Sequence, residues 1–140
     1  MRKSSIKRKS KETAVTVEIN LDGTGQGSIM TGVPFFDHML DQFRKHAFID
    51  LSVNTMGDYE IDDHHSVEDT GIVIGQAIKE ALGERKGITR YASARVVMDE
   101  ALISCDIDLG TRPYLVYDVP VNKERIKTFE TELCVEFWRA

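Results

Sequence analysis

The chain has 140 residues, of which 41% are hydrophobic and 29% are charged; these values are typical of one globular domain and exclude a disordered chain. The net charge is −5, and because six of the 18 Lys and Arg residues fall within the first eleven positions, the remainder is strongly acidic, which argues against a nucleic-acid-binding surface. No apolar run approaches the roughly 18 residues of a membrane span, and no signal-peptide-like segment lies near the start, so we expect a cytoplasmic protein without a membrane partner.

The first part of the chain alternates between apolar and polar residues, a pattern that predicts strands. The basic segment 6–12 favours the entry of a strand over an arm that binds nucleic acid, and 12–21 is predicted to be a strand that ends in a glycine-rich turn at 22–27. That turn lacks the spacing of a phosphate loop, and no helix pattern opens directly behind it. Further strands are predicted over 49–55 and 59–61.

Two helices are predicted in this part of the chain. Pro34 precedes the first, over 35–46, where apolar residues recur at helical spacing. The second begins after Asp62 or Asp63 and ends before Gly83. Asp63 is the predicted N-cap, because a short carboxylate accepts the first free backbone N–H groups of a helix.

The last third of the chain is predicted to hold three strands, over 95–98, 102–109 and 114–117, and a final helix over 129–140 capped by Thr128. Strands and helices mix without strict alternation, which favours an α+β fold with helices on one face of a mainly antiparallel sheet. Neither a C-cap glycine nor a polar tail follows the last helix, so we expect the chain to be cut short.

The segment 62–69, Asp-Asp-His-His-Ser-Val-Glu-Asp, concentrates groups that bind metals or protons at the start of the second predicted helix. His64 and Glu68 are one helical turn apart, so an imidazole and a carboxylate can converge on one ion. His65 points about 100° away from them, and the pattern therefore suits two metal ions; nitrogen and oxygen ligands without thiolate favour manganese, iron or zinc. The alternative is an ordinary solvated helix start, where acidic residues complement the helix dipole.

Other candidate residues are ambiguous on local pattern alone. His38 could be a metal ligand or a packed, hydrogen-bonded histidine of the first helix. Arg90 and Arg112 lie near turns or strand ends, where their guanidinium groups could grip a phosphate or form ordinary surface salt bridges. Glu12 could act as a general base only where a substrate proton lies within hydrogen-bond reach.

Taken in order, these segments resemble the imidazoleglycerol-phosphate dehydratase family, from about Arg8 to Ala140. The most specific matches are Phe-Phe-Asp-His-Met-Leu-Asp-Gln at 35–42 and Asp-Asp-His-His-Ser-Val-Glu-Asp-Thr-Gly at 62–71. Shorter matches lie at Lys11–Thr13, Met98–Ala101, Gly110–Tyr114 and Thr128–Leu133.

The resemblance implies a lyase of histidine biosynthesis that dehydrates imidazoleglycerol phosphate to imidazoleacetol phosphate. It implies two manganese ions per complete active site, with the substrate bound between them as an imidazolate and a diazafulvene-like intermediate. By the matching motifs, His38 and His65 would bind one ion, His64 and Glu68 would bind the other, and Glu136 would be a further metal ligand.

The same resemblance implies the substrate contacts. Glu12 matches a substrate-contacting glutamate that transfers a proton, and is the candidate catalytic residue; Gln42 matches another substrate-side residue, and Arg90 and Arg112 match the residues that hold the phosphate. The expected partners are therefore a small phosphate substrate and further copies of the chain, in the twenty-four-subunit shell of the family, with no nucleic acid.

Family members consist of two similar halves, each a mainly antiparallel sheet with helices on one face. By this resemblance, residues 1–92 correspond to the first half and 93–140 to the start of the second, which we expect to be incomplete. An alternative is therefore an inactive, truncated metal-binding fragment of the enzyme. A third hypothesis is a metal-dependent phosphate-ester hydrolase that uses Asp62–His65 and releases phosphate.

Overall fold

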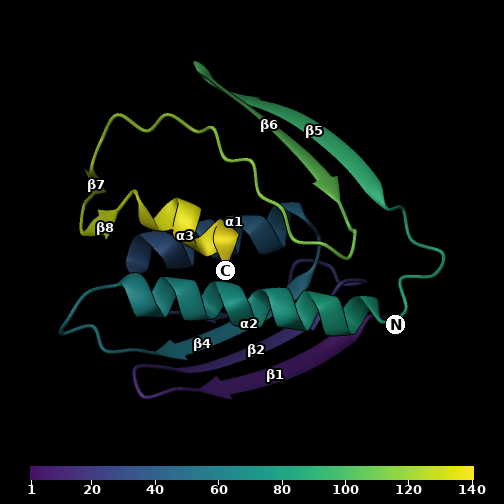
Figure 1. Cartoon of the computed structure of the whole chain (residues 1–140), viewed down its shortest axis with the longest axis horizontal. Coiled ribbons are helices and arrows are strands. Elements are labelled where there is room, and N and C mark those ends of the chain that lie inside the picture. Colours follow the sequence, from purple (N-terminus) through teal and green to yellow (C-terminus); the bar gives the residue numbers. More distant parts are fainter. The chain divides into compact units, whose positions relative to one another are not determined.

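The computed structural model describes residues 1–140, which form two compact units. The larger unit contains Met1–Gly83 and Tyr117–Ala140, and the smaller unit is Glu84–Val116. Helices and mainly antiparallel strands occur together (Figure 1), which confirms the predicted α+β class. None of the helices combines the length and the apolar character needed to cross a membrane.

A four-stranded sheet forms one layer of the larger unit, in the order β1-β2-β4-β3. β1 (Lys3–Lys9), β2 (Ala14–Asn20) and β4 (Asp50–Met56) pair antiparallel, and the short β3 (Ile29–Met30) runs parallel to β4. β1 confirms strand structure for residues 6–9 of the basic segment, but the prediction that 6–12 leads directly into the strand at 12–21 is wrong, because residues 10–13 form a turn between β1 and β2.

Two helices, α1 (Pro34–His46) and α2 (His64–Leu82), lie on one side of this sheet (Figure 1). Because successive side chains of a strand point to opposite faces, every second residue of β2 and β4 faces these helices and is buried. The core formed in this way includes Val15, Val17, Ile19, Phe36, Leu40, Leu51, Val53, Val67, Val73, Ile74 and Ala77.

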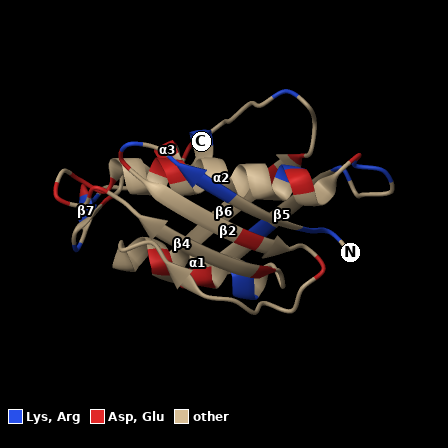
Figure 2. Ribbon diagram, turned by 90° about the horizontal axis from the view of Figure 1, so that it is seen from below, with Lys and Arg blue, Asp and Glu red and all other residues tan.

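β1 forms one edge of the sheet and carries basic side chains. Lys3, Lys7 and Lys9 are exposed, while Ile6 and Arg8 between them are partly buried; these basic residues colour both ends of the strand that starts at the N label in Figure 2. Charged lysines on an edge strand oppose pairing with a second sheet. The pattern fits a protected sheet edge.

The glycine-rich segment after β2 is the predicted turn, and it packs against the start of β4. A Cβ atom on Gly27, whose φ is +134°, would lie 2.1 Å from the carbonyl oxygen of Leu51, so only glycine fits there. Oδ1 of Asp50 accepts the N–H groups of Thr24 (2.9 Å) and Gln26 (3.0 Å). Two backbone N–H groups of this turn thus donate to a carboxylate of the protein itself.

The short strand predicted at 59–61 is wrong, because this segment is a turn. The hydroxyl of Tyr59 lies 2.8 Å from the carbonyl oxygens of both Thr31 and Thr55, and the N–H of Ile61 donates to the carbonyl of Asp58 (2.8 Å). These contacts turn the chain back toward α2. They take the place of a strand ladder.

The C-terminal part of the larger unit differs from the prediction. The helix expected over 129–140 is shorter: α3 covers Leu133–Arg139, and β7 (Arg125–Ile126) pairs with β8 (Phe129–Glu130) before it. Lys127, with φ +55°, lies in the turn between these two strands. The predicted cap at Thr128 therefore fails, because the helix begins only after Glu132.

The smaller unit contains the hairpin of β5 (Tyr91–Met98) and β6 (Ala101–Asp108), which confirms two predicted strands. Every residue of both strands is exposed, and alternate cross-strand pairs place only apolar residues on one face. The third predicted strand, over 114–117, is wrong: these residues have no ladder partner. The residues on the apolar face are Ala92, Ala94, Val96, Met98, Ala101, Ile103, Cys105 and Ile107.

Candidate functional site

The N-terminus of α2 presents the His-His-x-x-Glu segment. Asp63 is the N-cap residue, but its carboxylate makes no capping bond; instead Oδ1 of Asp62 accepts the N–H of His64 at 2.8 Å. The predicted capping role of Asp63 is therefore wrong, although its position is right. Burial, together with the charges of Asp62 and Glu130, raises the pKa of Asp63.

His64 and Glu68 form a pair of donors on one face of α2, as their spacing predicts. Nε2 of His64 lies 3.5 Å from Oε2 of Glu68, and both side chains are a little over 40% exposed, at 43% and 42%. Solvent and ions can therefore reach both groups. An imidazole nitrogen and a carboxylate oxygen at this separation fit two positions in the coordination sphere of a divalent cation.

His65 is held separately from this pair. Its ring centroid lies 6.2 Å from that of His64, with the planes at 84°, and its Nδ1 lies 2.9 Å from Oδ2 of Asp58. The hydrogen bond to Asp58 raises the pKa of His65, and the charges of Asp62 and Glu12 act in the same direction. Asp58 is a residue of this site that the sequence analysis did not identify.

The remaining predicted ligands do not complete a metal site within the chain. His38 lies on the exposed side of α1, and Oε1 of Glu136 on α3 accepts a bond from Arg139 at 3.0 Å. No three His, Cys, Asp or Glu side chains of the chain come close enough to hold one ion. The fold therefore brings together donors in pairs only.

Glu12 is presented by a tight turn between β1 and β2. Oγ of Ser10 accepts the N–H groups of Glu12 (3.2 Å) and Thr13 (3.0 Å). The hydroxyl of Thr13 donates to Asp69 of α2, whose other oxygen is 2.6 Å from Arg8. This network ties the turn to the helix that carries the histidines and leaves the side chain of Glu12 exposed.

Gln42 is the remaining predicted substrate residue of the larger unit. It lies on α1, about one helical turn after His38, and is partly buried. Its side chain has no hydrogen-bond partner in the chain. Nothing in the chain places it beside the histidines of α2, and its contact with the substrate stays a prediction.

The two predicted phosphate-binding arginines lie together in the smaller unit. Arg90 and Arg112 both line a hollow of about 520 Å³, together with Asp108 and residues 110–114. The guanidinium group of Arg90 is bidentate on Asp108, at 2.7 and 3.1 Å, and this contact lowers the pKa of Asp108. Arg85, which the sequence analysis missed, donates to the carbonyl of Gly110 at 2.6 Å and so holds the loop that carries Arg112.

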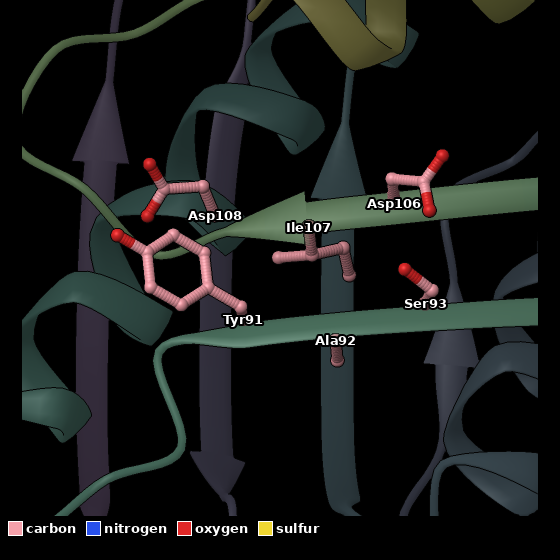
Figure 3. Close-up of a pocket in the computed structure, with 6 residues that line it drawn as sticks. All are labelled: Tyr91, Ala92, Ser93, Asp106, Ile107 and Asp108. Carbon is pink, nitrogen blue, oxygen red and sulfur yellow. The ribbon is translucent and has the colours of Figure 1, made fainter.

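A second hollow, of about 400 Å³, lies on the hairpin itself. Figure 3 shows Tyr91 and Ser93 of β5 across from Asp108 and Asp106 of β6. The guanidinium carbon of Arg90 lies 4.9 Å from the centre of the Tyr91 ring. Tyr91 and Asp108 thus contact Arg90 from two sides and help to fix its position in the first hollow. None of the residues that line the second hollow is a predicted site residue.

Comparison with known proteins gives the class and then the family. Two solved structures share the fold: imidazoleglycerol-phosphate dehydratase from Staphylococcus aureus (TM-score 0.84, 37% identity, 96% of this chain and 74% of that one) and IGPD from Pyrococcus furiosus (TM-score 0.77, 34% identity, 96% and 71%). The fold and the residues of α2 therefore define a lyase of the dehydratase class.

The sequence comparisons agree with this class. The model of the family "Imidazoleglycerol-phosphate dehydratase" matches residues 31–140. Proteins of that name from Sinorhizobium fredii and Acetivibrio thermocellus are 54% and 56% identical over 139 residues, which is 99% of this chain and 69% and 71% of theirs. The chain belongs to the imidazoleglycerol-phosphate dehydratase family.

Proposed function

We propose that this protein dehydrates imidazoleglycerol phosphate to imidazoleacetol phosphate in histidine biosynthesis, with Mn²⁺ as its cofactor. The observation that carries the proposal is the His-His-x-x-Glu segment at the exposed start of α2, in a chain of this family. The reaction removes the hydroxyl group from the carbon next to the imidazole ring and a hydrogen from the adjacent carbon. The resulting enol becomes the ketone of the product.

The proposed metal ligands are the nitrogen and oxygen donors of α2 with two residues from other helices. His64 and Glu68 would hold one ion, and the distance between their donor atoms supports this assignment. His65 and His38 would hold the second, with Glu136 as a further ligand. A bound Mn²⁺ supplies Lewis acidity, which makes the imidazole of the substrate easier to deprotonate.

The other residues would bind the substrate and move its proton. Arg90 and Arg112 would hold the phosphate, since they line one hollow and planar guanidinium groups match phosphate oxygens. Phosphate binding there would compete with Asp108 for Arg90. Glu12, exposed on its anchored turn, would take the proton from the substrate carbon, and Gln42 would contact the substrate.

We further propose that a complete site draws on more than one copy of the chain, in a cytoplasmic homo-oligomer with the twenty-four-subunit shell as its expected form. The support is that donors meet only in pairs within one chain, whereas zinc sites, which use the same nitrogen and oxygen donors, have three or more protein ligands. The same observation favours the second candidate, a protein that binds manganese weakly without turnover. The two differ in whether assembled, manganese-loaded protein has activity.

The test is a dehydration assay on metal-stripped protein to which Mn²⁺ is restored, over a range of protein concentrations. Mass spectrometry follows the loss of one water from imidazoleglycerol phosphate, and a parallel assay follows free phosphate. We expect manganese-dependent water loss that rises more steeply than protein concentration, with no phosphate release. Folded, manganese-loaded protein without turnover would favour the second candidate, and phosphate release would indicate the hydrolase.

A further inference from the structure

The turn that follows β4 makes the only polar contact to the ring of His65. Oδ2 of Asp58 lies 2.9 Å from Nδ1 of His65, and the other oxygen, Oδ1, is buried with no hydrogen-bond partner. The Asp58 side chain is 20% exposed, against 42% for His65. The carboxylate is therefore drawn out of water and its single partner is the imidazole, conditions that strengthen a hydrogen bond.

The backbone around Asp58 is built for this close approach to α2. A Cβ atom on Gly57 would lie 2.0 Å from Oγ of Ser66, the residue next to His65. Ser66 is fully buried at 0% exposure, so the turn comes this close to α2 because residue 57 has no side chain. The turn is also fixed by the bond between the N–H of Ile61 and the carbonyl of Asp58, at 2.8 Å. Asp58 thus reaches His65 from a turn that lies close against α2.

The chemistry of the pair decides where the ring proton lies. An ionised carboxylate can only accept a hydrogen bond, so Nδ1 of His65 must carry the hydrogen. In the neutral ring Nε2 is then the unprotonated nitrogen with a free lone pair, which is the form that binds a metal. His64 has no such partner: its Nε2 is 3.5 Å from Glu68, and no bond holds its Nδ1. The two adjacent histidines are therefore prepared differently.

We propose that Asp58 is a positioning residue that fixes His65 as the Nδ1–H tautomer and so leaves its Nε2 free to bind the proposed metal ion. The inference deepens the proposed function and rests on it, because it assigns an orienting partner to one proposed manganese ligand. Partners of this kind change metal affinity by about 10- to 100-fold in other metal sites. Asp58 would act through the ring of His65, which it contacts directly.

The test compares three variants by two measurements. Asp58→Ala removes the acceptor, Asp58→Asn keeps an oxygen acceptor without the charge, and Glu60→Ala is the matched control, which removes one negative charge from the same turn at an exposed residue. The first measurement is the nitrogen-15 spectrum of the histidine rings in metal-free protein, at a pH where the rings are neutral. The second is Mn²⁺ affinity, from the electron paramagnetic resonance signal of free Mn²⁺.

We expect wild type, Asp58→Asn and Glu60→Ala to show His65 with its hydrogen on Nδ1, and Asp58→Ala to show a mixture of tautomers. Mn²⁺ affinity should fall about 10- to 100-fold in Asp58→Ala, recover most of that loss in Asp58→Asn, and stay unchanged in Glu60→Ala. A hydrogen on Nε2 in the wild-type protein would overturn the proposal, as would equal loss of affinity in Asp58→Asn and Asp58→Ala.

Failure of the inference is distinguishable from failure of the proposed function. If wild type binds Mn²⁺ and Asp58→Ala binds it equally well, the inference alone is refuted. If wild type binds no Mn²⁺, the proposed function fails, and the metal role of Asp58 fails with it, whatever tautomer the ring spectrum shows. Should Asp58→Ala not fold, the wild-type ring spectrum still decides the assignment: a hydrogen on Nδ1 of His65 supports the proposal, and a hydrogen on Nε2 overturns it.

Discussion

A methyl group at position 71 would collide with the backbone of α3. A Cβ atom on Gly71 would lie 2.8 Å from the carbonyl oxygen of Phe137, 3.1 Å from Cβ of Ala140 and 3.2 Å from Cδ2 of Phe137. The nearest atom belongs to the backbone, so α3 must move, and overpacking of this kind costs about 1–3 kcal/mol. Replacing glycine by alanine inside a helix stabilises it by about 1 kcal/mol, which offsets part of that cost.

Gly75, one turn later in the same helix, provides the matched control, because a Cβ atom there meets nothing within 4 Å. We expect Gly75→Ala to raise the free energy of unfolding by up to about 1 kcal/mol, and Gly71→Ala to lie about 1–3 kcal/mol below Gly75→Ala. Urea unfolding followed by circular dichroism measures both. Equal stabilisation by the two substitutions would refute the packing of α3 against α2.

Two more changes test the larger unit and its turn. Leu51→Ala should lower the free energy of unfolding by about 2–5 kcal/mol, since Leu51 is 0% exposed. Met56→Ala, at a 67% exposed position of the same strand, should change it by less than about 0.5 kcal/mol. Similar losses in the two variants would contradict the burial of Leu51 in the core. The N–H groups of Thr24 and Gln26 lower the pKa of Asp50 below its usual 3.8. The contribution of ionised Asp50 to stability is therefore complete above that value and is lost as pH falls through the lower, folded-state pKa. Urea unfolding should show wild type more stable than Asp50→Asn at neutral pH, with the difference disappearing in strong acid. A difference that grows in acid would contradict this.

Periodicity in the sequence predicts the elements whose local pattern and final environment agree. β2, β4, α1 and α2 all have one apolar side, and each buries that side in the same core. The failures occur where tertiary contacts decide. Tyrosine is common in strands, but Tyr59 is held in a turn by hydrogen bonds from its hydroxyl group to two carbonyl oxygens. Phe129 suits a helix but is buried at 3% exposure in the short strand β8.

The candidate site likewise has some features that the sequence predicts and others that depend on tertiary contacts. The pairing of His64 with Glu68 follows from helix geometry, so spacing alone predicts it. Asp58 and Asp69 act across elements, and their roles depend on how a turn approaches α2. The one local signal for Asp58 is Gly57 before it, a residue that permits a close approach of backbone to helix. Spacing along the chain does not say which helix the turn will meet.

The most direct test of the central claim, that α2 binds manganese for the dehydration, is the Mn²⁺ content of Glu68→Gln. Glu80→Gln is the matched control, since Glu80 is an exposed glutamate in the last turn of the same helix. Each protein is saturated with Mn²⁺, and bound metal and dehydration activity are measured on the same sample. We predict that Glu68→Gln loses one manganese ion and its activity together, while Glu80→Gln keeps both. Unchanged metal content in Glu68→Gln would contradict the account.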